Sequence, residues 1–170
     1  MSFDVSEIYD RLYRFCYFRV RDRELSQDTV QEAFTRYIGR YGPVNEKALP
    51  VLYTIARNLC IDSVRRLPER TEYDDFLPDE RQAAGNQTED LVEKIGVQRA
   101  LSRMPGDEAE LLLLVLAVGF SIQDAGRILG LSRFAVYRRL QAGKKRLREE
   151  LAREGLVKRP AGKTDEKGGT

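Results

Sequence analysis

The stretch SIQDAGRILGLSRF, residues 121–134, decides how the C-terminal half of the chain folds. Ser121 stands where a serine can cap a helix, and Asp124 follows three residues later, as in a capping box. Gly130 allows a tight turn after one short helix, and Ser132 can cap the next helix. Two capped helices, the first of them short, joined by a glycine turn predict a helix-turn-helix.

The second of these helices, predicted from about residue 133 to 152, is strongly basic outside its apolar stripe. Between residues 133 and 148 it holds seven lysines and arginines and no acid; the first acid is Glu149. Such a helix can read base edges with its first turns and hold phosphates with its later bases. The alternative is a basic surface helix in an ordinary helical hairpin. The candidate DNA contacts are Ser132, Arg133, Phe134, Tyr137, Arg138, Arg139, Gln141, Lys144 and Lys145.

Apolar residues recur at helical spacing over most of the remaining chain. Residues 5–16 predict one amphipathic helix, residues 25–40 a second, and a third ends before Pro68. Three helices with short connections predict a small bundle. Another helix starts near Leu91 and leads to the apolar run 111–118, which we expect at the centre of a second core. We therefore expect an all-α protein with two small helical domains.

An acidic segment separates the two helical blocks. Residues 69–93 carry nine acids and two bases, a net charge of −7. Because a like-charged segment without apolar periodicity cannot bury a core, we expect a flexible acidic linker, for which a simple tether is a sufficient role. The expected organisation is a first domain at residues 1–68, the linker at 69–90, a second domain at 91–153 and a disordered tail at 154–170.

Composition excludes several classes of protein. The 170 residues contain no histidine, which excludes histidine-based acid–base catalysis and histidine-containing zinc sites. Cys16 and Cys60 each lie in an apolar helical pattern and are interpreted as buried thiols of a reducing compartment. No phosphate-binding loop, nucleophile–base pair or metal-ligand cluster is visible, so we expect no enzyme, no cofactor and no small-molecule substrate.

Hydropathy predicts no insertion into a membrane. The longest apolar run, residues 111–118, has eight residues, whereas a membrane span needs about twenty. The N-terminus is acidic and lacks the layout of a signal peptide. We therefore expect a cytoplasmic protein. The net charge is only +2, so the argument for nucleic-acid binding rests on where the charges lie.

Three stretches of the first block carry a family resemblance. They are LYRF at residues 12–15, DTVQEAF at 28–34 and LYTIARNLCIDSVRR at 52–66. In order and spacing they resemble the first domain of the extracytoplasmic-function (ECF) sigma factors of bacterial RNA polymerase. The second block, from residue 101 through the helix-turn-helix to 147, resembles the second sigma domain. The resemblance implies sigma domain 2, a three- or four-helix bundle, followed by sigma domain 4. Val51 stands where family members usually carry a tryptophan.

The resemblance implies a polymerase-binding surface in the second helix. ECF sigma factors use an Asp-x-x-Gln-Glu motif to grip a coiled coil of the β′ subunit, and Asp28, Gln31 and Glu32 match that motif. Without the resemblance, these three residues would be interpreted as an exposed acidic helix face. The family also implies a contact between sigma domain 4 and the β flap.

The third helix and the loop before it are implied to recognise the minus-ten promoter element. Asn58, Asp62 and Arg65 are spaced four and three residues apart, so they share one helix face. The loop at residues 42–47 would receive an unstacked base of the non-template strand. The implied contacts are Asn45, Lys47, Arg57, Asn58, Asp62, Arg65 and Arg66, and sigma domain 4 would read the minus-thirty-five element.

Together these features imply a dissociable sigma subunit that binds core RNA polymerase, recognises promoter DNA and directs transcription initiation. The family further implies control by an anti-sigma factor and a linker that runs towards the RNA exit path. One alternative is a stand-alone helix-turn-helix regulator, which leaves the motifs of the first block unexplained. Another is a sigma-like decoy that titrates an anti-sigma factor, a role that does not need an intact DNA-reading helix.

Overall fold

The computed structural model of the chain describes residues 4–66 and 88–158. Every regular element in these two stretches is helical, which confirms the predicted all-α fold. The elements are α1 (Val5–Val20), α2 (Arg23–Tyr41), α3 (Ala48–Arg66), α4 (Thr88–Ser102), α5 (Gly106–Leu112), the π-helical turn η1 (Leu113–Ala117), α6 (Ile122–Leu129) and α7 (Arg133–Arg153). The predicted linker lies outside the described residues except for 88–90, which form the start of α4.

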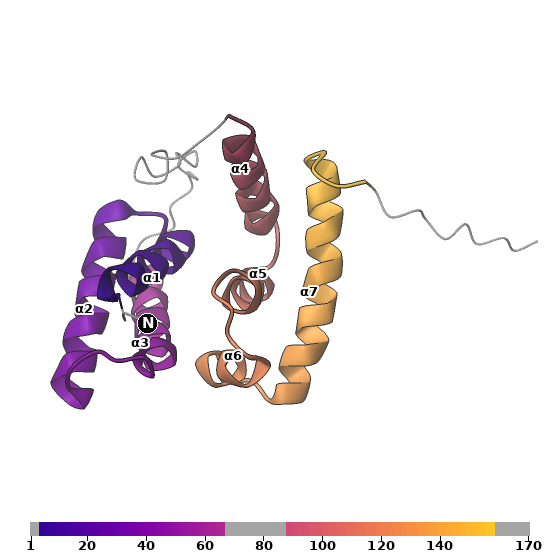
Figure 1. Cartoon of the computed structure of the whole chain (residues 1–170). Coiled ribbons are helices and arrows are strands. Elements are labelled where there is room, and N and C mark those ends of the chain that lie inside the picture. Colours follow the sequence, from indigo (N-terminus) through magenta and orange to yellow (C-terminus); the bar gives the residue numbers. More distant parts are fainter. Residues whose placement is uncertain (1–3, 67–87, 159–170) are drawn as a thin grey trace, which may run out of the picture. The chain divides into compact units, whose positions relative to one another are not determined.

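The described residues fall into two compact units. One contains residues 4–66 and 113–137, and the other contains residues 88–112 and 138–158, so α7 takes part in both. In the first unit, α1, α2 and α3 pack against one another as a three-helix bundle (Figure 1). Its centre is formed by fully buried side chains, among them Leu12 of α1, Val30 of α2 and Leu52 of α3.

Local hydrogen bonds fix where α2 begins and ends. The Asp22 carboxylate accepts a hydrogen bond from the Leu25 amide at 2.9 Å and caps the N-terminus. At the other end Gly42 has φ of +84°, and its N–H donates to the Ile38 carbonyl at 2.9 Å. Glycine meets this backbone geometry without steric cost, so the chain leaves α2 sharply and enters the loop at residues 42–47.

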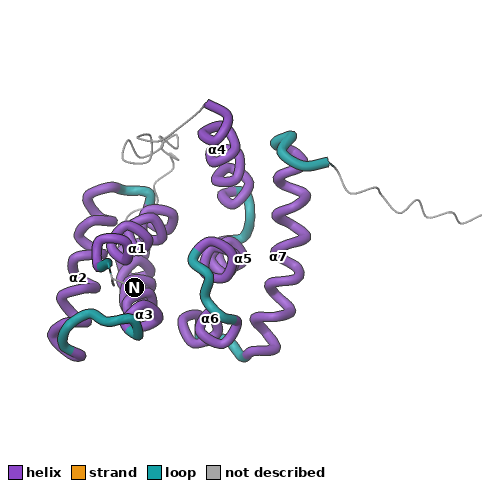
Figure 2. The backbone as a smooth tube through the Cα atoms, in the orientation of Figure 1, coloured by secondary structure: helices purple, strands orange, loops and turns teal. Residues whose placement is uncertain are grey.

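The helix-turn-helix forms as the sequence predicts (Figure 2). The Ser121 hydroxyl accepts from the Asp124 amide at 3.0 Å and donates to the Asp124 carboxylate at 3.0 Å. Gly130 adopts the left-handed conformation with φ of +67° and ends α6. The Ser132 hydroxyl then accepts from the Ala135 amide at 3.1 Å and caps α7.

The apolar run at residues 111–118 differs from the expectation of one central helix. α5 ends at Leu112, and the chain continues as the π-helical turn η1. Leu111 and Leu114 are buried, whereas Leu116 is 53% exposed. A π turn is wider than an α turn, so it shifts the helical positions that follow it, and the run is not buried on all sides.

The described chain continues beyond α7 to residue 158, into the segment that the sequence analysis assigns to a tail. Residues 154–157 form a turn in which Gly155 has φ of +76° and the Leu156 amide donates to the Leu151 carbonyl at 3.0 Å. Leu156 lies directly against Gly96 of α4, because a Cβ added at Gly96 would stand 2.6 Å from Leu156 Cδ1. The tail predicted at residues 154–170 stays a prediction: residues 154–158 pack as described, and residues 159–170 lie outside the described residues.

Within the described stretches, none of the helices combines the length and the apolar character needed to cross a membrane.

Candidate nucleic-acid interface

The predicted DNA-reading face of α7 lies in solvent. Phe134 is 73% exposed and Tyr137 is 53% exposed, although large apolar groups are usually covered. On the opposite side of the same helical turns, Val136 and Leu140 are buried, with 0% and 4% of their surface exposed. All nine residues proposed from the sequence for this surface are exposed, from Ser132 to Lys145. Their DNA contacts stay a prediction.

A close backbone approach holds α6 against the start of α7. The Leu131 amide donates to the Gly126 carbonyl at 2.8 Å. A Cβ added at Gly126 would stand 2.8 Å from the Leu131 carbonyl oxygen and 3.3 Å from Val136 Cγ2. Only glycine fits there without movement of the backbone, so Gly126 sets how tightly the turn is closed.

The basic residues of α7 divide into two groups that the sequence did not separate. Arg139, Arg146 and Arg153 recur every seventh residue and so share one face. That face is ion-paired: Arg139 lies 3.5 Å from Asp107, Arg146 lies 3.4 Å from Glu108, and Arg153 lies 2.9 Å from Glu150. Lys144 and Lys145 lie outside this face and are exposed.

This division changes the interpretation of Arg139. The arginine is 46% exposed but is held by an acid of α5, so it is shared between a structural ion pair and any contact with DNA. No local sequence signal could reveal the pair, because Asp107 and Arg139 are 32 positions apart.

The predicted polymerase-binding residues form one exposed face of α2. Asp28, Gln31 and Glu32 are all exposed, while Thr29 and Val30 between them are buried. The Arg36 guanidinium donates to the Glu32 carboxylate at 2.7 Å, which places a basic group beside one of the two acids. The face can therefore offer carboxylate and amide groups to a basic partner.

The predicted minus-ten residues of α3 also lie outward. Asn58, Asp62, Arg65 and Arg66 are exposed, and Arg57 is half-buried. The opposite face of this helix carries Tyr53, which is fully buried between aromatic rings. Its ring centroid lies 5.1 Å from that of Phe15 and 5.0 Å from that of Phe120, within the same unit.

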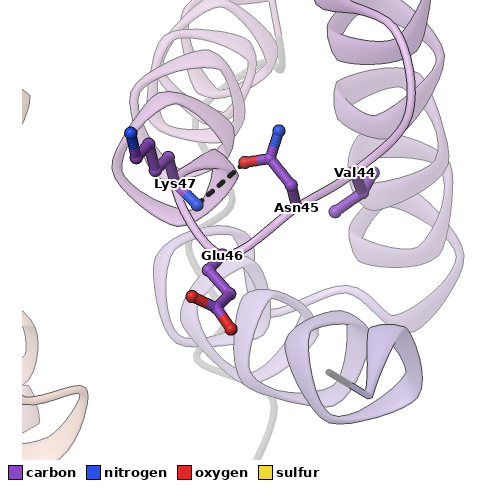
Figure 3. Close-up of a pocket in the computed structure, with 4 residues that line it drawn as sticks. All are labelled: Val44, Asn45, Glu46 and Lys47. Carbon is purple, nitrogen blue, oxygen red and sulfur yellow. Dashed lines mark hydrogen bonds between the residues drawn. The ribbon is translucent and has the colours of Figure 1, made fainter. Parts of the chain in front are cut away.

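The loop between α2 and α3 lines an open surface pocket of about 550 Å³, formed by Val44, Asn45, Glu46 and Lys47 (Figure 3). The Asn45 side-chain oxygen accepts from the Lys47 amide at 2.9 Å, and the Asn45 carbonyl accepts from the Ala48 amide at 2.9 Å. These bonds fix the loop against the start of α3. In Figure 3 the Asn45 amide nitrogen points away from this hydrogen bond, so it is left as a donor for another group.

The two cysteines lie together inside the bundle. Cys16 of α1 and Cys60 of α3 are both free and fully buried, which confirms the interpretation as buried thiols. The hydrogen bond to the Cys60 thiol, together with burial, raises the pKa of Cys16 far above its ordinary range. Burial likewise raises the pKa of the Tyr53 hydroxyl. These groups stay neutral and belong to the core rather than to a reactive site.

Two family matches cover the two helical blocks. Residues 5–69 match Sigma-70 region 2, and residues 95–147 match Sigma-70, region 4. The chain thus combines, in order, the two regions of a sigma factor, as its motifs predict.

Two similar proteins indicate which class of sigma factor this chain represents. The chain is 34% identical over 140 residues to a probable RNA polymerase sigma factor, RfaY, of Xanthomonas campestris, covering 77% of this chain and 35% of that longer protein. It is 31% identical over 135 residues to the ECF RNA polymerase sigma factor SigM of Bacillus subtilis, covering 75% of this chain and 83% of the relative. The chain belongs to the ECF family of RNA polymerase sigma factors.

A solved structure has the same fold. The sigma factor RpoE from Bartonella quintana, crystallised in complex with the anti-sigma factor NepR, matches with a TM-score of 0.64 and 21% identity. The match covers 87% of this chain and 94% of that one.

Proposed function

We propose that the chain directs transcription initiation through three surfaces, each carried by one helical element. The exposed face of α2, with Asp28, Gln31 and Glu32, binds the β′ coiled coil of core RNA polymerase. Sigma domain 2 occupies residues 1–68 and sigma domain 4 residues 91–153, and the latter contacts the β flap. The observation that carries the proposal is that a polar α2 face and a basic α7 face, both exposed, lie in the two matched sigma regions of one chain.

The proposed role of α3 and its loop is recognition of the minus-ten element. The exposed face with Asn58, Asp62 and Arg65 follows the promoter strand, since amides read base edges and arginines hold phosphates. The pocket at Val44–Lys47 takes one unstacked base of the non-template strand, and Asn45 offers that base its amide N–H groups. Arg57, Arg66 and Lys47 add positive charge beside the strand.

The proposed role of α7 is recognition of the minus-thirty-five element in the major groove. Arg133, Phe134 and Tyr137 stand on the first turn and a half, where a recognition helix meets base edges. Arg138 and Gln141 continue this face, and Ser132, Lys144 and Lys145 lie where they can meet phosphates. Arg139 contributes less, because Asp107 holds it.

Control by an anti-sigma factor is part of the proposal. The structural neighbour RpoE is described in complex with NepR, and this chain shares its fold. We expect a partner of that class to cover sigma surfaces of this chain. Adding such a partner in equimolar amount to a transcription assay should abolish a transcript that depends on the chain.

Run-off transcription tests the proposal directly. Purified chain and core polymerase are mixed with a DNA fragment that carries the region upstream of the chain's own gene. Asp28→Ala should weaken binding to core polymerase, and Arg138→Ala should weaken promoter binding, so both should reduce the transcript by about tenfold or more. Asp10→Ala, an exposed acid of α1, and Arg153→Ala, a paired arginine at the end of α7, are matched controls.

The outcomes separate the proposal from its alternatives. A transcript that requires the chain and falls only with the two test variants supports a sigma factor with two working surfaces. No transcript and no co-elution with core polymerase would overturn it in favour of a stand-alone regulator or a decoy.

A further inference from the structure

Two acids at the start of α5 reach across to α7 and pair with arginines on one side of that helix. Asp107 Oδ2 lies 3.5 Å from Arg139 Nη1, and Glu108 Oε2 lies 3.4 Å from Arg146 Nε. The acids are adjacent in the first turn of α5, whereas the arginines are seven residues apart. The paired side of α7 therefore extends over about two helical turns, and both pairs lie within one compact unit.

The paired side of α7 is not the side proposed to read base edges. Phe134, which is 73% exposed, marks the reading side, and the buried Val136 marks the packing side. At 3.6 residues per turn, Arg139 lies about 140° around the helix from Phe134 and about 60° from Val136. Arg139 thus stands at the edge of the helix, where it would meet the DNA backbone rather than the bases.

The two acids differ in how deeply they are packed. The Glu108 side chain is 19% exposed, so its pair with Arg146 belongs to the packing of α5 on α7. The Asp107 side chain is 65% exposed, and such exposed pairs contribute little to stability. The helix dipole favours an acid in the first turn of α5, but it does not explain why this acid faces an arginine of another helix.

An acid beside a DNA-facing arginine weakens binding that depends on charge alone. Each cation that neutralises a phosphate adds about 0.9 to the slope of log K against log salt concentration. Asp107 neutralises Arg139 before DNA arrives and, because it is exposed, also repels phosphates itself. Arg139 therefore adds less to phosphate binding than an arginine without an acid beside it.

This loss falls unequally on promoter DNA and on unrelated DNA. A complex held by charge alone lets α7 roll and slide along the backbone, so a cation on any side of the helix can meet a phosphate. Base contacts fix the angle of α7 in the groove, and Arg139 then stays at the edge of the helix, within reach of Asp107. Asp107 therefore weakens binding to unrelated DNA more than binding to the promoter.

We propose that Asp107 is a specificity-determining residue of the minus-thirty-five surface, which holds Arg139 back from phosphates and so lowers binding to unrelated DNA. The assignment rests on the proposed function of α7, and it adds a residue of α5 that need not touch a base. The alternative is an ion pair that only joins α5 to α7, and the test below separates the two.

The test compares the binding of one holoenzyme to two DNA duplexes. Core polymerase with the full chain is titrated into a labelled duplex that carries the minus-thirty-five element of the chain's own gene, or into a scrambled duplex of equal length and composition. Asp107→Asn removes the charge and keeps the size of the side chain. It should tighten binding to the scrambled duplex by about three- to tenfold at low salt and raise its salt slope by about 0.9, while affinity for the promoter duplex stays within about twofold.

Two further variants make the result specific. Asp107→Glu keeps the charge and should leave both affinities within about twofold. In the background of Arg139→Ala, Asp107→Asn should change binding to the scrambled duplex by less than about twofold, because no arginine remains to be released. Core polymerase is the same in every sample, and co-elution with it shows that each variant is folded.

The outcomes either support or overturn the specificity role. Unchanged binding of the scrambled duplex by Asp107→Asn overturns it, as does an equal gain on both duplexes or a gain that persists without Arg139. If the unmodified chain gives core polymerase no preference for the promoter duplex over the scrambled one, the proposed function of α7 falls. A preference that is present but unaffected by Asp107→Asn overturns the role of Asp107 alone.

Discussion

At Gly126, a single added methyl group should lower the stability of the fold. Alanine usually stabilises a helix interior by about 1 kcal/mol relative to glycine. At Gly126, however, the added Cβ would stand 2.8 Å from a backbone oxygen, which can move only if the turn opens. We expect Gly126→Ala to lower the free energy of unfolding by about 1–2 kcal/mol, since overpacking costs about 1–3 kcal/mol. Urea denaturation followed by circular dichroism measures the change.

Gly39 supplies the matched control for this prediction. It lies inside α2, and a Cβ added there would meet nothing within 4 Å. Gly39→Ala should therefore raise the free energy of unfolding by up to about 1 kcal/mol. Equal effects of the two substitutions would show that the close approach in the turn does not govern stability.

The buried thiol of Cys16 predicts how stability depends on pH. Because its folded pKa lies above the ordinary value of 9.0, the unfolded chain releases a proton at a pH where the folded chain retains it. Stability is therefore fully present below about pH 9 and falls as the pH rises further, by up to about 1.4 kcal/mol per pH unit. Urea midpoints measured across this range should show a smaller slope for Cys16→Ala.

Tyr53 is a second buried group that makes stability depend on pH, and a variant can separate its effect from that of Cys16. Its pKa is also raised by burial, but from an ordinary value of 10.0, so its contribution to the loss of stability starts at higher pH. Tyr53→Phe should leave the slope just above pH 9 unchanged. A flat stability profile in the unmodified chain would contradict the burial of the thiol pair.

At the scale of the element, α7 carries two kinds of basic residue that should behave differently with salt. Lys144 and Lys145 are exposed and outside the paired face, so each one that contacts a phosphate adds about 0.9 to the slope of log K against log salt concentration. Replacing both with alanine should reduce that slope by up to about 1.8 and weaken promoter binding across sequences. Fluorescence anisotropy at several salt concentrations measures it.

Arg146 provides the contrast within the same helix. Its guanidinium lies 3.4 Å from the Glu108 carboxylate, whose side chain is 19% exposed. Arg146→Ala should leave the salt slope unchanged and lower the free energy of unfolding by about 1 kcal/mol, because a largely covered acid loses its partner. A reduced slope for Arg146→Ala would show that the paired face also reaches DNA.

At this scale the sequence predicts well those features that depend on residues only a few positions apart. The caps at Ser121 and Ser132 and the turn at Gly130 depend on residues within a few positions, so the helix-turn-helix could be placed in advance. The pairing of Arg139 with Asp107 and the packing of Leu156 on Gly96 join distant parts of the chain, so no local pattern reveals them.

At the scale of the whole molecule, the family assignment came from order rather than from any single motif. Each half is compatible with other functions: a helix-turn-helix occurs in many regulators, and an acidic helix face is common on surfaces. Both sets of motifs in sequence identify a sigma factor, and the two matched regions agree with that order. The sequence of this chain does not predict which groups of a partner would meet the proposed α2 surface, because the partner supplies half of such a contact.

If promoter binding and polymerase binding use separate surfaces, DNA whose strands are already open should restore transcription to variants of the first surface and not to variants of the second. Under the proposed function, the α7 lysines place the chain on the upstream element before the strands open, whereas the α2 face is needed on any template. On a fragment whose minus-ten region is already mismatched, Lys144→Ala with Lys145→Ala should regain most of the run-off transcript lost on paired DNA. Asp28→Ala should remain defective on both templates, because opening the DNA does not restore binding to core polymerase. If the open template rescued Asp28→Ala as fully as the lysine variant, the α2 face would act in promoter opening and not in polymerase binding.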